Sequence, residues 1–382
     1  MTTSSPSLPA ERIFPIPKPV IRHHGKTIFG PMKEWHTKGR IAPALLLTGT
    51  SGIGKRHVAY FIAQWILCER NGFSKHEASE FGGDLFGTAP PLETADPLTE
   101  PCGECASCQR AIHGNWVDFV EIAPDPETGT LKIEQFRRMK ESLGFGAHEG
   151  AYRIHLIPNA DRMTPQAANS VLKILEEPPR GWLFFLTTND PSLVLPTVLS
   201  RCQVLRLKPF DSATLDELLL ASDVPAQRKA VCLELAQGSW GKAAALASDE
   251  IWEYRIEFFD FLKSPQGHLN RLIDWTSQDN QAGEQQLSRF ALLLDQLEHM
   301  LFDLIRWSLD PKDPVRHGWS NSDGAAALAS HARSMTKQLG GTDQARLFWI
   351  ERAERLARAR QESLSPVNRK LLIQDLLIPF LR

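Results

Sequence analysis

The sequence lacks long hydrophobic runs and any strong surplus of charge. No apolar stretch approaches the roughly 20 residues that a membrane-spanning helix needs, and the Ser- and Pro-rich beginning has no apolar signal core. The 43 Lys and Arg residues are balanced by 45 Asp and Glu residues. This balance excludes a global positive field, so contact with nucleic acid must come from a local patch or from partners. We expect a cytoplasmic protein that does not associate with membranes.

Cysteine is scarce, with six residues in the chain. Three of them lie in one short segment, and a fourth lies upstream of that segment. In a reducing compartment such a group indicates a metal site rather than disulfides. Three thiolates in a Cys-x-x-Cys-x-x-Cys pattern can converge on a tetrahedral zinc ion, and a fourth upstream can complete it. The predicted ligands are Cys102, Cys105 and Cys108, with Cys68 as the fourth.

Two questions about this cluster stay open in the sequence. The chain between Cys68 and Cys102 is long, so the spacing does not fix Cys68 as a ligand. An iron–sulfur cluster is the chemical alternative to zinc. Four thiolates would leave no open position, which indicates a structural rather than a catalytic metal. Cys202 and Cys232 lie on apolar patterns and are expected to be buried packing residues.

Apolar runs alternate with helical patterns over the first half of the chain. This alternation predicts an open parallel α/β sheet. Strands are expected at residues 44–48, 119–122, 153–157, 182–188 and 204–207, and helices at residues 28–40, 57–70, 133–143 and 165–177. Residues 1–20 are expected to be extended, and residues 71–100 to form an insertion.

After residue 210 the pattern is helical throughout, with helices expected at residues 215–221 and 226–237 and polar loops near 264–286 and 309–325. The 382 residues suffice for two or three domains. We expect three. They are an α/β domain at 1–208 with a zinc module at 68–110, a small helical lid at 209–250 and an all-helical domain at 251–382.

A glycine-rich loop stands between the first predicted strand and the following helix. In this context the loop predicts a phosphate-binding site, where backbone N–H groups and a lysine meet phosphate oxygens. A plain glycine turn is the alternative. The candidate nucleotide-binding residues are Gly49, Thr50, Ser51, Gly52, Ile53, Gly54, Lys55 and Arg56.

Two features of this site argue against hydrolysis of ATP by the chain itself. Arg56 stands where a hydroxyl should hold Mg²⁺, and arginine presents only hydrogen-bond donors. A nucleotide hydrolase also needs acids after a later strand, but Pro158 and Asn159 follow strand 153–157. Asp161 is either a displaced acid or a capping residue. We expect ATP to be bound at most without hydrolysis, and no Mg²⁺.

Several strings together resemble the clamp-loader subunits of bacterial DNA polymerase III, a family of the AAA+ class. They are TGTSGIGK, the CxxCxxC insertion, NSVLKILEEPP at residues 169–179, FFLTTNDP at 184–191 and LSRCQ at 199–203. The resemblance covers about residues 28–210, and the tail SPVNRKLLIQDLLIPFL is similar to the end of the family's helical collar. It implies an AAA+ P-loop domain followed by a lid and an oligomerising collar.

Within this family the residues favour the delta′ type over the ATP-hydrolysing gamma/tau type. The gamma/tau type carries Ser or Thr after the loop lysine, an Asp-Glu pair after the later strand and a sensor arginine. Here Arg56, Pro158-Asn159 and Gly241 stand at those positions. An active gamma/tau-like subunit is the alternative, and a zinc-containing adaptor unconnected with replication is a third hypothesis.

The resemblance gives Arg201, in the Ser-Arg-Cys string, the role of an arginine finger that acts in the ATP site of a neighbouring subunit. It implies a heteropentamer with gamma/tau and delta subunits that loads the sliding clamp on primed DNA. Basic residues of helix 133–140 could contact DNA phosphates without sequence preference. They are Arg137, Arg138 and Lys140, and a solvated basic face is the alternative.

Overall fold

The computed structural model describes residues 16–71, 100–122, 124–125, 129–141, 147–148, 151–222, 224–264, 267–277, 289–311, 319–363 and 368–381. The chain divides into two compact units, Met1–Leu218 and Leu219–Arg382. The predicted insertion at 71–100 lies almost wholly outside the described residues, as do parts of the loops predicted near 264–286 and 309–325.

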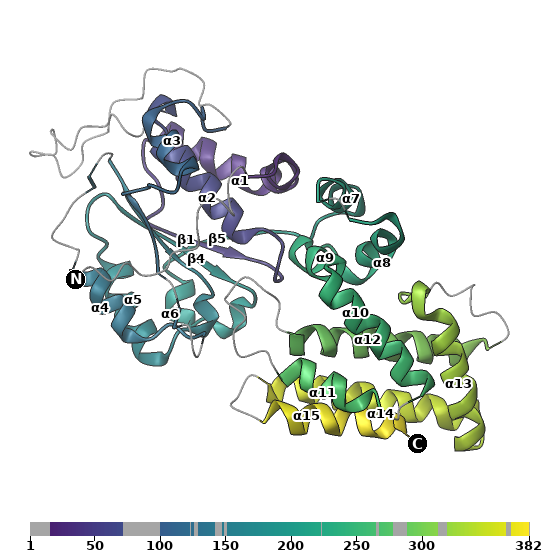
Figure 1. The fold of residues 1–382 in the computed structure, drawn as a ribbon. Helices are drawn as coiled ribbons and strands as arrows, with labels where there is room; N and C mark the ends of the chain where they lie inside the picture. The colour runs from purple at the N-terminus through teal and green to yellow at the C-terminus, as the bar shows by residue number, and fades with distance from the viewer. Residues whose placement is uncertain are drawn as a thin grey trace, which may run out of the picture. The chain divides into compact units, whose positions relative to one another are not determined.

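A five-stranded parallel sheet forms the centre of the first unit (Figure 1). Its order is β2-β3-β4-β1-β5, and it confirms the predicted parallel α/β sheet with flanking helices. The central strands β1 and β4 are apolar runs buried along their whole length, as expected of a sheet covered on both faces. The bounds are β1 Ala44–Thr48, β2 Phe119–Glu121, β3 Arg153–Ile157, β4 Trp182–Thr188 and β5 Gln203–Arg206.

Helices cover both faces of this sheet. Figure 1 shows α1, α2 and α3 on one face and α4, α5 and α6 on the other. The second face holds a buried cluster that includes Leu46, Phe136, Val171 and Phe184. The bounds are α1 Lys18–Lys38, α2 Lys55–Leu67, α3 Ala106–Ile112, α4 Ile133–Glu141, α5 Pro165–Glu176 and α6 Pro196–Leu199.

Helix α1 corrects the prediction for the start of the chain. Residues 18–20 were expected to be extended and the helix to begin at residue 28, but α1 begins at Lys18. Gly25, Gly30 and Pro31 lie inside the helix and weaken its local signal. Tertiary burial of Val20, Ile28 and other apolar residues on one face outweighs that weakness.

All regular elements in the described residues of the second unit are helices, as predicted. The first helix after the sheet, α7 (Ser212–Leu220), spans the boundary between the units. The others are α8 Ala226–Ala236, α9 Trp240–Ala247, α10 Asp249–Lys263, α11 Leu269–Ser277, α12 Arg289–Leu309, α13 Ala325–Leu339, α14 Thr342–Glu362 and α15 Arg369–Leu377. Helix α11 lies where a polar loop was expected, because burial of Leu272 and Ile273 holds it against the core.

The core of the second unit is one cluster built from α10 to α15, with Phe258, Leu297, Trp349 and Ile373 among its buried members. An ion pair between Lys242 and Asp295, 2.6 Å long, ties α9 to α12 inside this unit. The division of the chain at residues 208 and 250 stays a prediction. None of the described helices is long and apolar enough to cross a membrane.

Candidate functional site

The glycine-rich loop joins the end of β1 to the start of α2, as predicted. Gly49 has φ 147° and Gly54 has φ 85°, values that favour glycine. A Cβ at Gly49 would lie 2.7 Å from the carbonyl oxygen of Leu207. The loop therefore has a backbone conformation and a close packing that larger residues would disturb.

Lys55, the first residue of α2, turns its amine back onto the loop. Its Nζ donates to the carbonyl oxygens of Gly49 (2.7 Å) and Thr50 (2.9 Å) and to Oδ1 of Asn189 (2.7 Å). These three acceptors match the three N–H donors of the ammonium group. Burial lowers the pKa of Lys55 to about 8, while the negative charge of Asp161 opposes this shift. A phosphate could engage this amine only by replacing one of its present partners.

Arg56 is directed at a carboxylate on β2. Its guanidinium forms an ion pair with Glu121, and the Tyr60 hydroxyl donates to the same carboxylate at 2.9 Å. Burial raises the pKa of Glu121, and the charge of Arg56 opposes that rise. The guanidinium of Arg56 thus places a positive charge at this position, and it offers no lone pair for Mg²⁺.

The residues after β3 do not form an acidic pair. Pro158 is buried, and Asn159 adopts φ 48° while its backbone N–H donates to Oγ1 of Thr187 (3.1 Å). Asp161 accepts a hydrogen bond from Oγ1 of Thr188 (2.8 Å) and interacts electrostatically with Lys55. The structure therefore places one acid near the loop lysine, held by β4.

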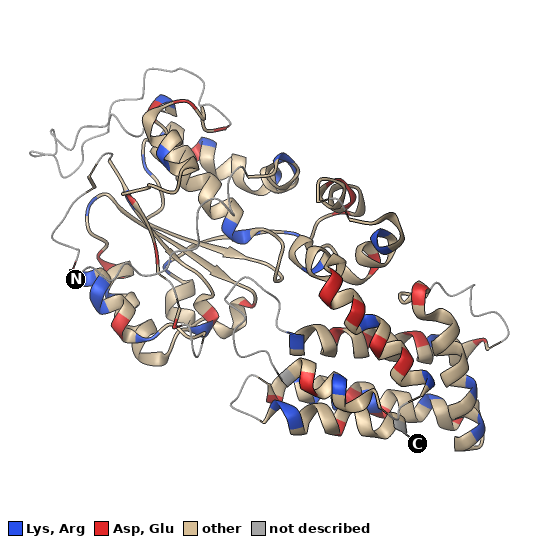
Figure 2. Cartoon of the chain, viewed as in Figure 1, with Lys and Arg blue, Asp and Glu red and all other residues tan. Residues whose placement is uncertain are grey.

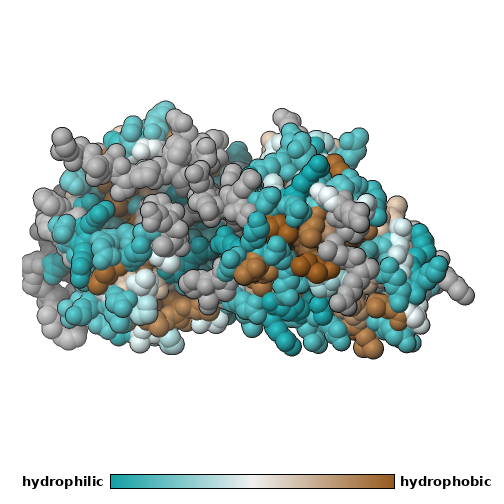
Figure 3. Space-filling model, turned by 60° about the horizontal axis from the view of Figure 1, so that its bottom comes forward, coloured by the Kyte–Doolittle hydropathy of each residue, from teal (hydrophilic) through white to brown (hydrophobic). Residues whose placement is uncertain are grey.

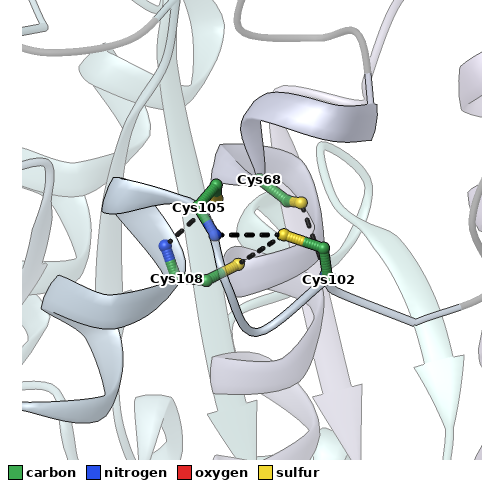
Figure 4. Close-up of side chains that lie close together, drawn as sticks. All are labelled: Cys68, Cys102, Cys105 and Cys108. Atoms are coloured by element: carbon green, nitrogen blue, oxygen red, sulfur yellow. Dashed lines mark hydrogen bonds between the residues drawn. The ribbon is translucent and has the colours of Figure 1, made fainter.

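The four predicted metal ligands converge at the end of α2 and the start of α3 (Figure 4). Their sulfur atoms all lie within 4.8 Å of one another, and the sulfurs of Cys102 and Cys108 are 3.9 Å apart. Sulfurs at 2.3 Å from a tetrahedral ion would be separated by about 3.8 Å. The cluster therefore fits a single tetrahedral ion, and Cys68 is confirmed as a member of it.

Backbone hydrogen bonds hold these sulfurs in place. The N–H groups of Cys102, Cys105 and Cys108 donate to the sulfurs of Cys68, Cys102 and Cys105 at 3.5, 3.3 and 3.4 Å. Such donors stabilise thiolate charge, which a metal ligand carries. In an iron–sulfur cluster the four cysteines are divided among two or four irons, so convergence of all four sulfurs on one point favours a mononuclear site.

The two remaining cysteines lie elsewhere and are packing residues. Cys232 is buried in α8, and Cys202 is half-buried against the apolar cluster beneath α5 and α6. Burial raises the pKa of both thiols, to about 12 for Cys202 and about 11 for Cys232.

Arg201 follows the short helix α6 and lies at the surface, with 34% of its side chain exposed. Its Nη2 donates to Oε1 of Glu176 at the end of α5 (2.6 Å), and its Nη1 donates to the carbonyl oxygen of Thr197 (2.9 Å). The guanidinium is therefore folded against its own subunit but remains partly open to solvent.

Figure 2 colours the Lys and Arg residues of α4 blue. Arg137 and Arg138 are exposed and Lys140 is half-buried, whereas Phe136 and Met139 face the core. Gly241, at the position expected for a sensor arginine, lies in the first turn of α9 in the second unit.

Sequence reasoning missed three polar partners in this region: Asn189 for Lys55, Glu121 for Arg56 and Glu176 for Arg201. Each follows or ends an observed strand or helix. The signal that could have found them is their place at element ends, because the carboxyl ends of parallel strands meet at one edge of the sheet.

Comparison with known proteins matches residues 89–211 to the family described as "DNA polymerase III, delta subunit". The delta′ subunit of Yersinia pestis is 26% identical over 90% of each chain. The delta′ subunit of Bacillus subtilis is 27% identical over 60% of this chain and 63% of its own length. The tau subunit of Escherichia coli is 29% identical, over 56% of this chain and 30% of its own length.

Among solved structures, a gamma-subunit-related protein of Thermotoga maritima covers 92% of this chain and 98% of its own, with 16% identity and a TM-score of 0.44. The tau relative does not match this chain better than the delta′ relatives do. Together with the predicted motifs and the parallel sheet, the sequence matches show that the chain is similar to the delta′ subunits of DNA polymerase III.

Proposed function

We propose that the chain is a cytoplasmic delta′-type subunit of a clamp-loader complex and supplies Arg201 as an arginine finger to the ATP site of a neighbouring subunit. The observation that carries this proposal is the contrast between two cationic sites. Lys55 and Arg56 are engaged inside the chain, whereas Arg201 presents a partly exposed guanidinium on a short surface segment. A planar guanidinium stabilises charge that spreads over the transferring phosphoryl oxygens.

The chain's own loop is proposed to hold ATP, if it holds it at all, without hydrolysis and without Mg²⁺. Bound phosphates would have to replace the carbonyl and amide partners of Lys55. Position 56 offers no oxygen ligand for the metal. Titration with a fluorescent ATP analogue, with and without Mg²⁺, measures this binding, and a strong Mg²⁺ dependence would contradict the proposal.

Zinc is proposed as the ion of the four-cysteine cluster, held by Cys68, Cys102, Cys105 and Cys108. A zinc ion with four thiolate ligands supplies structural cross-linking and no open position for chemistry. The partners of the proposed complex are the gamma/tau and delta subunits, the sliding clamp and primed DNA. The basic side of α4 would add DNA phosphate contacts, which carry no sequence preference.

Reconstitution with gamma/tau and delta subunits tests the finger. Arg201→Ala is expected to reduce ATP hydrolysis at the ATP site of the neighbouring subunit by roughly 10³-fold or more. Clamp loading should fall with it. Arg40→Ala is the matched control, because Arg40 is an exposed arginine beyond the end of α1, a helix of the opposite face of the sheet. Unchanged ATPase and clamp loading in the Arg201→Ala complex would refute the proposed role.

A further inference from the structure

We propose that Glu176 is a latch that holds Arg201 folded onto its own subunit until a neighbouring phosphate displaces it. This inference rests on the proposed finger role of Arg201. It adds a positioning residue to that role and a reason why the finger would stay inactive without a properly seated partner.

The contacts of Arg201 leave its terminal nitrogens already engaged. Nη2 donates to Glu176 at 2.6 Å, and Nη1 donates to the Thr197 carbonyl at 2.9 Å, with the Ser200 hydroxyl at 3.4 Å. A two-pronged contact with a phosphate uses the same pair of nitrogens. The guanidinium must therefore leave Glu176 before it can bind phosphate in this way.

Glu176 occupies a position where a carboxylate is unfavourable for its own helix. It is the last residue of α5, and the carboxyl end of a helix carries partial negative charge that disfavours anions. Pro178 and Pro179 come after Glu177 and exclude a further helical turn. Arg201 offsets the charge of Glu176 and of the helix end together, so the pair has an electrostatic reason to form here.

The pair is also weak enough to open. The side chains of Glu176 and Arg201 are 47% and 34% exposed, and ion pairs at such sites change an equilibrium by about fivefold at most. A phosphate group carries more negative charge than one carboxylate and offers more acceptor oxygens. Arg201 can thus exchange Glu176 for a neighbour's phosphate without a large barrier. Without that phosphate, the carboxylate of Glu176 holds Arg201 on its own subunit.

Glu177 supplies a matched control for this latch. It is the next residue, it is also exposed, and the described contacts of Arg201 involve only Glu176 among carboxylates. Replacing either glutamate by glutamine removes one charge from the same helix end. Only the Glu176 change replaces the charged carboxylate that accepts from Arg201 Nη2 by a neutral amide.

The first test uses the isolated chain and does not depend on any activity. Phenylglyoxal modifies accessible guanidinium groups, and peptide mass spectrometry reports the rate at Arg201 relative to Arg40. Glu176→Gln is expected to raise the relative rate at Arg201 two- to fivefold, and Glu177→Gln to leave it unchanged. Equal rates in Glu176→Gln and the unaltered chain would overturn the latch.

The second test uses the reconstituted complex in the absence of clamp and DNA. Glu176→Gln is expected to raise this basal ATPase by up to about fivefold, and the rise should vanish in the Glu176→Gln/Arg201→Ala double variant. A fall in ATPase with Glu176→Gln would show that the carboxylate orients the finger, and it would overturn the latch. If Arg201→Ala alone has no effect, the finger role fails and the latch fails with it, whatever the phenylglyoxal rates are.

Discussion

Arg56 gives the glycine-rich loop a buried ion pair with the sheet. Its guanidinium reaches Glu121 at the end of β2, and Tyr60 donates to the same carboxylate. The side chain of Glu121 is only 8% exposed, so its charge depends on these two partners. The ion pair therefore ties the start of α2 to the edge of the sheet, and replacement of Arg56 by serine would leave a buried carboxylate without its cation.

Removal of the Arg56 charge is expected to destabilise the protein. Breaking a buried ion pair by loss of one partner costs about 3 kcal/mol or more, and the partial exposure of Arg56 reduces this toward about 2 kcal/mol. Chemical denaturation of Arg56→Met compared with the unaltered chain measures the loss. The double variant Arg56→Met/Glu121→Gln should recover most of it, because no buried charge is then left unpaired.

The same variant makes a prediction about pH. Burial raises the pKa of Glu121 and Arg56 opposes the rise, so Arg56→Met moves this pKa higher still. A carboxyl with a raised folded pKa destabilises the fold above that pKa, and the penalty disappears as pH falls through it. The stability gap between Arg56→Met and the unaltered chain should therefore be largest at neutral pH and shrink on acidification. A gap that is constant with pH would contradict the assignment.

At the scale of elements, the sequence predicted what local patterns determine. The strands β1 and β4 are continuous or nearly continuous apolar runs, and all five strands were placed within a residue or two of their observed bounds. The start of α1 and the whole of α11 were missed because glycines, a proline and polar residues hide a helix that tertiary burial stabilises. Local sequence periodicity does not reveal that tertiary burial.

The candidate site was likewise predictable only where local sequence motifs determine it. The loop and the cysteines are local motifs, and both were found. Glu121, Asn189 and Glu176 were not found, because the order of the strands in the sheet sets which element ends meet. The pairing of Arg56 with Glu121 joins residues that are distant in sequence, and only the sheet topology brings them together.

Helix α3 is an element that we expect to depend on the metal. It has seven residues, and an isolated helix shorter than about 12 residues is marginal in water. Cys105 caps its first turn and Cys108 lies inside it. Zinc bound to both residues, and to Cys68 and Cys102, would anchor α3 to the end of α2.

Cys105→Ser tests this dependence, with Cys202→Ser as a cysteine control outside the cluster. The unaltered chain and the control should contain about one equivalent of zinc by elemental analysis, given one four-ligand site, and Cys105→Ser should lose most of it. Hydrogen exchange should then accelerate in α3 and remain unchanged in α4. Iron in place of zinc would contradict the metal assignment, and unchanged exchange after metal loss would contradict the structural role.

At the scale of the whole molecule, the proposed chemistry and the proposed assembly surface belong to different compact units. Arg201, the glycine loop and the cysteine cluster lie in Met1–Leu218, whereas the helices resembling a collar lie in Leu219–Arg382. The second unit has its own apolar core, in which Phe258, Trp349 and Ile373 are fully buried. A core of this kind can support folding without the sheet domain.

A fragment of residues 225–382, which begins just before α8, should therefore fold by itself and still join the gamma/tau and delta subunits. It should show cooperative thermal unfolding of its helical circular dichroism and co-elute with the partners. The complex that it forms should lack the ATPase that depends on Arg201. Residues 1–222 alone retain Arg201 but should not co-elute, because they lack the collar-like helices. Assembly by the 1–222 fragment, together with no assembly by a folded 225–382 fragment, would assign oligomerisation to the sheet domain instead.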